Sequence, residues 1–493
     1  MVKTDPALYS AFCAKDPRFD GRFFVGVSST RIYCRPVCRA RMPREENCTF
    51  FSSAAEAEHE GYRPCLICRP ELAPGTARVD GFASLARRAA GLMEESCGSG
   101  ASLTELAARL GCSDRHLRRV FEAEYHISPV QYLQTCRLLL AKSLLTDTAL
   151  SVTEVALASG FGSLRRFHDA FKGKYHLTPT GLRKRLPKER RTCADIRMFL
   201  GYRPPYLWDD LLSFLEQRAI PGIERVQDGV YYRTVSIRDM RENLVQGWIA
   251  VADAPGKSRL EVTLGESLLP VLPQVLGRVK NMFDLSCDPE IICDTLSSMN
   301  VLRQGLFQKG TRLPGCFDPF EIAVRAILGQ QISVKAASIL AGRVAAAFGE
   351  PVSTPVEGLT LTFPTAERMA ALDGPVTGHL GPLGVIRSRS EAIQGLARAV
   401  TGGELSFDAC CDPEAGWKRL RAIRGVGSWT ASYIAMRAMA WPDAFLEDDA
   451  GIRRALPGRT PKELRAMAEA WRPWRSYAVM ALWNELERRK RTS

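Results

Sequence analysis

The sequence predicts a multidomain protein that is mainly α-helical and contains one α+β domain. The chain has 493 residues, and single hydrophobic cores rarely grow beyond about 250–300 residues. Its composition changes at three places, near residues 73–76, 182–191 and 287–289. Strand-like runs concentrate in residues 195–287, whereas helical spacing dominates on either side of that region. We therefore expect four domains, which span residues 1–75, 81–186, 195–287 and 288–493.

The composition argues against a disordered protein, a membrane-spanning protein and a secreted protein. Hydrophobic residues make up 46% of the chain, which is ample for globular folding. There is no stretch of about 18 uninterrupted apolar residues, and the N-terminus lacks a charged-then-apolar signal pattern. We therefore expect a cytoplasmic protein without a membrane partner.

The formal net charge of +13 is distributed unevenly. Residues 1–191 hold 30 Lys and Arg against 20 Asp and Glu, and the remaining 302 residues hold 37 against 34. An excess of about ten positive charges in the first part indicates a polyanionic partner. A solvated basic surface would have the same composition, so charge alone leaves both interpretations open.

The first domain contains two close pairs of cysteines, Cys34 with Cys38 and Cys65 with Cys68. Such spacing places two sulfurs on each of two tight loops, which is typical of a single tetrahedral Zn²⁺ site. Two unrelated pairs of buried cysteines are the alternative. The chain has 15 cysteines and no signal pattern, so a disulfide framework is not expected.

The residues around these cysteine pairs resemble those of a known protein family. The segments 32–41 (IYCRPVCRAR) and 61–68 (GYRPCLIC) resemble the N-terminal domain of the Ada methylation-response family. That resemblance implies that Cys34 accepts a methyl group irreversibly from a DNA methylphosphotriester. Four thiolates on Zn²⁺ carry about −2 net charge, so methylation of one halves the charge and raises affinity for DNA. A purely structural zinc ribbon without methyl transfer is the alternative.

The second domain contains an internal repeat. Residues 104–107 (TELA) recur as 153–156 (TEVA), and the pattern Tyr-His-(Ile/Leu)-(Ser/Thr)-Pro recurs from Tyr125 to Tyr175. Each copy predicts a helix, a turn at Gly111 or Gly160, and a second helix. The pair is similar to the AraC-type DNA-binding domain. The basic side chains that we expect to contact DNA on the second helices are Arg115, Arg118, Arg119, Arg165 and Arg166.

The third domain shows β-prone runs at residues 230–237, 248–251 and 260–264, which predict a small antiparallel sheet with a few helices. Its function is not visible from these residues.

The fourth domain carries a Gly-x-Gly hairpin. Within residues 420–433, one helix ends, Gly425 and Gly427 make the turn, and a second helix begins at Ser428. Amides that open a helix can hold a DNA phosphate. Asp448 and Asp449 follow about twenty residues later, and capping of a helix is the commoner fate of such an acidic pair.

Together with residues 313–321 (LPGCFDPFE), 325–331 (RAILGQQ) and 471–478 (WRPWRSYA), this hairpin resembles the helix-hairpin-helix glycosylases, specifically the AlkA-type 3-methyladenine DNA glycosylase II. The resemblance covers residues 199–489, and it implies a small α+β domain for the sheet region, followed by an all-α domain with Asp449 as the catalytic carboxylate. Bifunctional relatives have a lysine where this chain has Trp429, so we expect hydrolysis without strand cleavage.

The same resemblance implies an aromatic pocket for an electron-poor base, formed by Phe214, Trp429, Tyr433 and Trp483. The best-known AlkA-type enzyme fills the gap left by the flipped base with leucine, and this chain has Gln331 instead. Its hairpin also reads Arg424-Gly425 in place of Pro-Gly.

We therefore expect an alkylation-response protein with three activities. These are hydrolysis of alkylated bases with Asp449, methyl transfer to Cys34, and methylation-dependent binding to promoter sites. The expected partners are double-stranded DNA and RNA polymerase, the expected cofactor is one Zn²⁺ ion, and a monomer in the bacterial nucleoid is expected. The alternative is a transcription regulator with structural zinc whose glycosylase half only binds damaged DNA.

Overall fold

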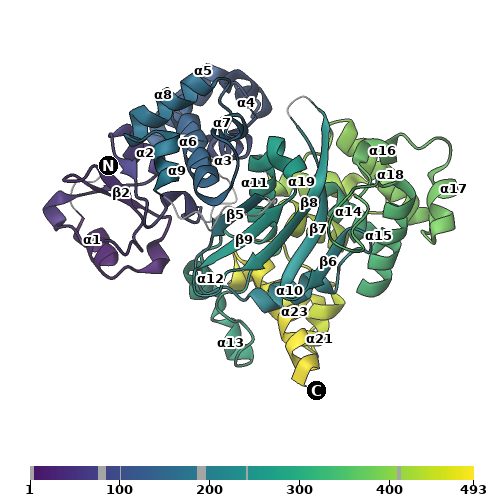
Figure 1. Ribbon diagram of the computed structural model, residues 1–493. Coiled ribbons are helices and arrows are strands. Elements are labelled where there is room, and N and C mark those ends of the chain that lie inside the picture. The colour runs from purple at the N-terminus through teal and green to yellow at the C-terminus, as the bar shows by residue number, and fades with distance from the viewer. Residues whose placement is uncertain are drawn as a thin grey trace.

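The computed structural model describes residues 5–75, 85–99, 101–185, 196–239, 242–407 and 412–492. Figure 1 shows a small N-terminal module at the left, a helical module above it, and a central sheet with further helices to its right and below. The mainly α multidomain architecture with an α+β part confirms the predicted fold class. The basic run 182–191, which the sequence predicts to be an exposed linker, begins inside helix α9 (Pro179–Lys184), and its residues 186–191 lie outside the described residues.

The N-terminal module is a four-stranded sheet with two short helices. The strand order is β3-β1-β2-β4, and only β2 and β4 are parallel. Its elements are α1 (Pro6–Cys13), β1 (Phe24–Val27), β2 (Ile32–Cys34), β3 (Cys48–Phe51), α2 (Ala54–His59) and β4 (Arg63–Pro64). The parallel register pairs Tyr33 with Pro64, and this brings the two cysteine loops together at one end of the sheet.

The helical module repeats one unit twice, as predicted. Its helices are α3 (Leu85–Ser96), α4 (Leu103–Arg109), α5 (Asp114–Tyr125), α6 (Pro129–Asp147), α7 (Val152–Ala158), α8 (Leu164–Tyr175) and α9 (Pro179–Lys184). Gly111 and Gly160 adopt φ of +68° and +80° at the predicted turns. His126 and His176 end α5 and α8 in the left-handed conformation, so the two units match in backbone as well as in sequence.

The α+β part is built on an antiparallel sheet of order β5-β9-β8-β7-β6. Its elements are β5 (Ile196–Gly201), α10 (Trp208–Glu216), β6 (Glu224–Gln227), β7 (Val230–Arg238), β8 (Leu244–Asp253), β9 (Arg259–Leu264) and α11 (Leu272–Met282). The three predicted runs lie within β7, β8 and β9. Alternate residues of β9, Leu260, Val262 and Leu264, are fully buried, as the period of a half-buried strand requires.

The remaining helices form the C-terminal part. They are α12 (Pro289–Leu296), α13 (Met299–Leu302), α14 (Pro319–Leu328), α15 (Val334–Phe348), α16 (Ala366–Ala370), α17 (Val376–Leu380), α18 (Arg387–Thr401), α19 (Pro413–Ala422), α20 (Ser428–Ala438), α21 (Ala450–Ala455), α22 (Pro461–Ala468) and α23 (Arg475–Thr492). Short 3₁₀ helices occupy Pro17–Phe19, Glu45–Asn47, Pro70–Leu72, Glu266–Val271, Gly381–Leu383 and Glu469–Trp471. Among the described residues, no helix has the length and apolar character needed to cross a bilayer.

The largest hydrophobic core continues from one module into the next. It joins Phe167 and Phe171 of the second helical unit to Val262 of the sheet and Leu482 of α23. Phe121 of the first unit belongs to a separate core, and the N-terminal module has two small clusters of its own. The second helical unit therefore shares a hydrophobic core with the C-terminal half of the chain.

Candidate functional site

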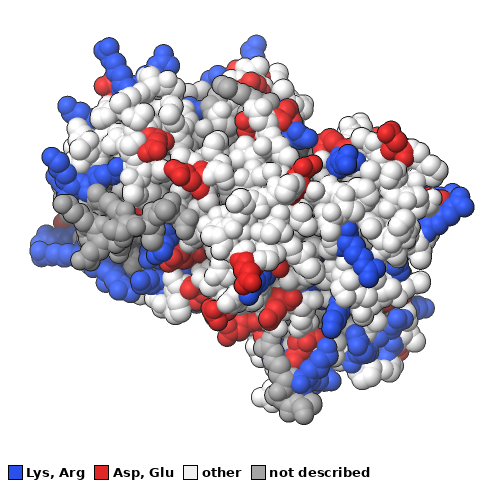
Figure 2. Space-filling model, turned by 45° about the vertical axis from the view of Figure 1, so that its right-hand side comes forward, with Lys and Arg blue, Asp and Glu red and all other residues white. Residues whose placement is uncertain are grey.

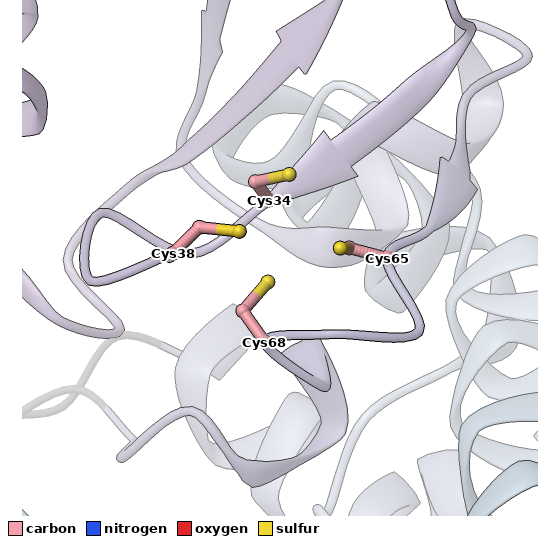
Figure 3. Close-up of side chains that lie close together, drawn as sticks. All are labelled: Cys34, Cys38, Cys65 and Cys68. Atoms are coloured by element: carbon pink, nitrogen blue, oxygen red, sulfur yellow. The ribbon is translucent and has the colours of Figure 1, made fainter. Parts of the chain in front are cut away.

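The four predicted zinc ligands converge. The sulfurs of Cys34, Cys38, Cys65 and Cys68 all lie within 4.8 Å of one another, and Figure 3 shows them pointing toward a common centre. A tetrahedral Zn²⁺ with Zn–S bonds of about 2.3 Å needs sulfurs about 3.8 Å apart, so the donor set fits one ion. Cys13 is exposed, and Cys48 and Cys97 lie outside this group. The predicted four-cysteine Zn²⁺ site is confirmed.

The arginines of the zinc loops differ in their contacts. Arg35 forms an ion pair with Asp20 and donates through Nη1 to the carbonyl of Cys68 at 3.1 Å. This contact holds the loop of the first cysteine pair against the loop of the second. Arg39 and Arg41 are exposed beside the same loops, so a basic surface surrounds the thiolates.

Backbone N–H groups donate to two of the four sulfurs. The N–H of Arg35 lies 3.3 Å from Cys68 Sγ, and that of Ile67 lies 3.4 Å from Cys65 Sγ. Within the described part of the module, no backbone N–H donates to Cys34 or Cys38. Because a hydrogen bond stabilises the thiolate that receives it, the electron pairs of Cys34 and Cys38 are more available than those of Cys65 and Cys68.

The predicted DNA-contacting arginines are exposed on α5 and α8. Leu117 and Phe121 of α5, and Phe167 and Phe171 of α8, are fully buried on the opposite face. Arg118 pairs with Asp114 at 3.0 Å, and Arg165 lies 4.0 Å from Asp169. Exposed pairs of this kind contribute little, so these guanidinium groups can exchange their partners for phosphates.

A cleft of about 1670 Å³ opens between the α+β part and the C-terminal helices. Such a volume exceeds that of a typical small-molecule pocket and suits an extended ligand. Basic residues on its rim are Lys335, Arg453, Arg454, Arg489 and Lys490. On the face shown in Figure 2, Lys and Arg gather at the left and the lower right, and Asp and Glu gather between them, below the centre.

The Gly-x-Gly hairpin lies on this cleft. Gly425 has a φ of +89°, and a Cβ there would meet Ala392 at 3.0 Å, so the turn requires glycine. Gly427 is the N-cap of α20, and no side chain caps that helix. The first amides of α20, from Ser428 onward, are therefore available to a phosphate.

Asp449 lies at the bottom of the cleft as the N-cap of α21, with 9% of its surface exposed. Its Oδ1 accepts from the backbone N–H of Ile452 and from Trp483 Nε1, both at 2.9 Å. Its Oδ2 accepts from Trp429 Nε1 at 3.0 Å. The carboxylate both caps a helix and faces the cleft. Helix capping and a place in the candidate active site, which the sequence offered as alternatives for the acidic pair, are therefore combined in Asp449. Asp448 is exposed.

The structure brings the four predicted aromatic residues together. Trp429 stacks on Tyr433 with centroids 5.3 Å apart, and Phe214 stacks on Trp483 at 6.1 Å. All four line the cleft with Asp449, although Phe214 comes from α10, far away in sequence. The hydrogen bonds from both indoles to Asp449 were not predicted, because a pattern of residue types does not reveal which way an N–H points.

Sequence reasoning missed two arginines that pack against the aromatic residues, Arg218 in the lining of the cleft and Arg437 buried behind it. The guanidinium carbon of Arg218 lies 3.7 Å from the centroid of Phe214, and that of Arg437 lies 4.9 Å from it. Arg437 also donates to Tyr433 Oη at 2.9 Å. Burial acts to raise the pKa of Tyr433, but the three guanidinium groups of Arg437, Arg218 and Arg325 lower it below the ordinary value. Each missed arginine follows an aromatic residue by four positions, and that helical spacing was a usable signal.

The turn between α14 and α15 contains two consecutive glutamines whose side chains have different surroundings. Gln330 donates to the carbonyl of Gly425 at 2.9 Å and to Thr430 Oγ1 at 3.0 Å, so it ties this turn to the hairpin. Gln331 is exposed at the cleft with a φ of +57°. Gln331 is therefore accessible at the cleft, and Gln330 holds the turn that carries it.

Four known domain families match consecutive parts of the chain. "Metal binding domain of Ada" matches residues 7–71, and "Helix-turn-helix domain" matches 106–185. "AlkA N-terminal domain" matches residues 197–318, and "HhH-GPD superfamily base excision DNA repair protein" matches 324–475.

Three relatives illustrate the similarity. A probable bifunctional transcriptional activator/DNA repair enzyme AlkA of Mycobacterium tuberculosis is 36% identical and covers 97% of this chain and 96% of its own length. DNA-3-methyladenine glycosylase 2 of Escherichia coli is 38% identical over 58% of this chain and 95% of that protein. The bifunctional transcriptional activator/DNA repair enzyme Ada of Escherichia coli is 35% identical over 32% of this chain and 43% of that protein.

Proposed function

We propose a detailed function for a chain that belongs to the family of AlkA/Ada-type bifunctional transcriptional activators and DNA repair enzymes. Its glycosylase domain removes alkylated bases such as 3-methyladenine with Asp449, and its zinc domain moves a methyl group from a DNA phosphotriester to Cys34. The observation that carries the first activity is the Asp449 carboxylate, held by three N–H donors between aromatic side chains in the cleft.

The glycosylase reaction breaks the bond between a flipped base and its sugar. An alkylated purine carries positive charge, so it leaves with the bonding electron pair and a positive oxocarbenium ion forms on the sugar. Water then adds to the anomeric carbon and loses a proton to solvent. Stacked indole and phenyl rings favour a positively charged base over a neutral one, which raises selectivity for damaged purines.

Asp449 acts in this proposal by stabilising the oxocarbenium ion. Three of its acceptor positions are already in use by Ile452, Trp429 and Trp483. A carboxylate so occupied is a preorganised negative charge, and this suits electrostatic stabilisation better than proton abstraction from water. Trp429 stands where a lyase needs lysine, so no Schiff base forms and the DNA strand stays intact.

The Asp449→Asn variant tests this proposal, because the amide keeps the size of the side chain and removes its charge. We expect release of 3-methyladenine from methylated duplex DNA to fall about 10³-fold, with DNA binding retained. Asp448→Asn is the matched control, since that neighbour is exposed, and it should release base at the wild-type rate. Undiminished release by Asp449→Asn would overturn the assignment. The alternative, a regulator that only binds damage, predicts no enzymatic release by the wild-type protein.

For methyl transfer, the thiolate of Cys34 attacks the methyl carbon of the phosphotriester. A carbon–sulfur bond forms, the carbon–oxygen bond breaks, and the electron pair stays on oxygen as a phosphodiester anion. Bound Zn²⁺ keeps the cysteine deprotonated at neutral pH. Among the described residues, backbone donors reach Cys65 and Cys68 but neither Cys34 nor Cys38. This favours the first pair as the acceptor, and the family resemblance selects Cys34 within it.

Peptide mass after incubation with methylphosphotriester-containing DNA tests this activity. We expect one methyl group on the peptide with Cys34 and none on the peptides with Cys38, Cys65 or Cys68. A purely structural zinc domain predicts no mass gain on any of them. Undamaged DNA of the same sequence is the control, because adventitious alkylation would not depend on the phosphotriester.

The regulatory part of the proposal assigns promoter DNA to the arginines of α5 and α8, namely Arg115, Arg118, Arg119, Arg165 and Arg166. Replacement of Arg115 and Arg166 by alanine should lower DNA affinity and flatten its salt dependence, because each phosphate contact releases counterions. RNA polymerase as a partner and a monomeric state complete the proposal. Co-purification with RNA polymerase on promoter DNA and sedimentation in solution test these two points.

A further inference from the structure

The N-terminal and helical modules fit closely against the glycosylase half of the chain. Arg22 of the N-terminal module donates through Nε to the buried Asp288 at 2.9 Å. Arg203, which is also buried, donates through Nη2 to the carbonyl of Gly75 at 2.8 Å. A Cβ on Gly201 of β5 would lie 2.0 Å from a backbone oxygen of the N-terminal module. These contacts, and the core that α8 shares with the sheet, fix one half of the chain relative to the other.

The helices that carry the predicted DNA-contacting arginines lie on the far side of the helical module. α3 packs against both α5 and α11, and α6 packs against the edge strand β5. In Figure 1, α5 and α8 lie above α3 and α6, which separate them from the sheet. Arg115 and Arg166 are exposed on the faces of α5 and α8 opposite the buried residues. These guanidinium groups are therefore directed away from the glycosylase half.

The cleft lies at the opposite edge of the sheet. The strand order runs from β5 to β6, and the usual spacing of strands places these two about 19 Å apart. α10, which carries Phe214, packs against β6, and Arg325 of α14 pairs with Glu224 of β6 at 2.9 Å. Phe214 and Arg325 both line the cleft. The sheet therefore stands between the cleft and the exposed arginines of the helical module.

Charge and stiffness argue against one short duplex on both surfaces. Figure 2 shows Asp and Glu between the two zones that are rich in Lys and Arg, so a duplex laid across that face would bring its phosphates to carboxylates. The persistence length of DNA is about 150 base pairs, so a duplex of about 20 base pairs stays nearly straight. A short duplex bound at one surface therefore leaves the other surface free.

We propose that one molecule of this protein holds two separate segments of duplex DNA at once, one on α5 and α8 and the other in the cleft. The inference rests on the proposed function, which assigns DNA to each surface, and adds that both surfaces are occupied together. On a long DNA molecule, binding of one segment raises the effective concentration of the cleft near neighbouring segments. The protein thus examines DNA for damaged bases while it stays bound elsewhere.

Sedimentation of complexes with short DNA tests the stoichiometry. The protein is mixed at low salt with an excess of two duplexes of about 20 base pairs, one undamaged and one with an abasic site. We expect complexes of one protein chain with two duplexes. If each duplex binds alone but the complex never holds more than one, the two surfaces compete for DNA and the inference is overturned.

Capture on beads tests which surfaces are responsible. Protein is loaded on a bead-bound undamaged duplex and then offered a labelled duplex with an abasic site. Arg115→Ala with Arg166→Ala alters the helical surface, and Lys335→Glu with Arg453→Glu alters the rim of the cleft. We expect each pair of substitutions to lower capture of the labelled duplex about tenfold, because phosphate contacts are lost at one surface. Each of these variants should sediment with one duplex per chain.

Lys257→Glu with Arg368→Glu is the matched control, since both residues are exposed and neither lines the cleft nor lies on α5 or α8. It should capture the labelled duplex as the wild-type protein does. Equal losses in the control and in the two surface variants would mean that net charge alone governs capture, and the inference would fail.

A mixture of the two surface variants distinguishes one chain from a dimer. Two duplexes on one chain require both surfaces intact in the same molecule, so the mixture should capture no more than either variant alone. Restored capture would assign the second duplex to a partner chain and overturn the inference. A wild-type protein that fails to bind either duplex by itself contradicts the proposed function as well, so the two failures are distinguishable.

Discussion

The zinc site and the glycosylase cleft are assembled in different ways. All four thiolates come from residues 34–68, on two loops that one parallel strand pair brings together. The cleft collects Phe214 from α10, Trp429 from α20, Asp449 from the start of α21 and Trp483 from α23. A site made within one short segment can fold with little help, whereas a site made from distant elements requires the whole domain.

The two sites also treat negative charge differently. The zinc site concentrates thiolates around a cation, and their charge is balanced only in part. In the cleft, one carboxylate accepts from N–H donors, and Arg218 lies over the ring of Phe214 in the same cleft. The first arrangement favours transfer of a methyl cation to sulfur. The second favours stabilisation of a positive intermediate that never bonds to the protein.

Among these predictions, removal of one zinc ligand should have the largest effect. It should destabilise the N-terminal module and leave the glycosylase cleft intact. We expect Cys65→Ser to abolish zinc binding and expose the N-terminal module to proteolysis, because metal binding supplies about 10–16 kcal/mol to such small domains. Release of methylated bases should stay within about twofold, since the cleft belongs to separate cores. Metal analysis and a base-release assay check both points. A large loss of base release would show that the two regions are not independent.

Loss of one indole N–H should have the next largest effect. Trp429→Phe and Trp483→Phe keep an aromatic ring and remove one donor to Asp449, and hydrogen bonds to charged groups contribute about 1.5–3 kcal/mol. We expect base release to slow about 10- to 100-fold in either variant.

Trp417→Phe is the matched control for these variants. The indole of Trp417 donates to Ser432 Oγ at 3.0 Å, and Trp417 is not among the residues that line the cleft. It should release base at nearly the wild-type rate. Equal losses in all three variants would mean that general packing, not the hold on Asp449, is responsible.

Removal of the guanidinium over Phe214 should change selectivity. Burial lowers the pKa of Arg218 to about 10, yet the group stays positively charged at neutral pH beside the place of a cationic base. We expect Arg218→Met to increase release of a cationic methylated purine relative to an uncharged purine about 5-fold, since repulsion between two unit charges a few ångströms apart in a water-filled cleft is of the order of 1 kcal/mol. Paired single-turnover assays measure that ratio. A decrease would assign Arg218 to base binding.

Substitution at the α14–α15 turn should have the smallest effect. Gln331→Leu replaces an exposed polar side chain with the apolar type that fills a gap in stacked bases, and we expect DNA containing an abasic site to bind about 2- to 5-fold more tightly. Gln330→Leu should have the opposite effect, because it removes the bonds to Gly425 and Thr430. Equal changes in both variants would contradict the separate roles assigned to the two glutamines.

The sequence was most informative where spacing is a direct consequence of chemistry. The Cys-x₃-Cys and Cys-x₂-Cys pairs predicted the zinc ligands, and the 49- to 50-residue repeat predicted both helical units with their turns at Gly111 and Gly160. The hairpin prediction placed the start of α20 at Ser428, as observed. The four domain boundaries remain predictions, because the family match at residues 197–318 and the shared core both extend past them.

The sequence by itself determined which residues hold zinc, which helices repeat and which carboxylate follows the hairpin, because each of these is a local pattern of residue types. Only the tertiary structure decided that Trp429 and Trp483 direct their N–H groups at Asp449, that Arg218 and Arg437 lie over Phe214, and that Glu58 joins the zinc module to α6. Those contacts join residues tens to hundreds of positions apart. Their geometry depends on how helices and strands pack, and residue type alone does not specify it.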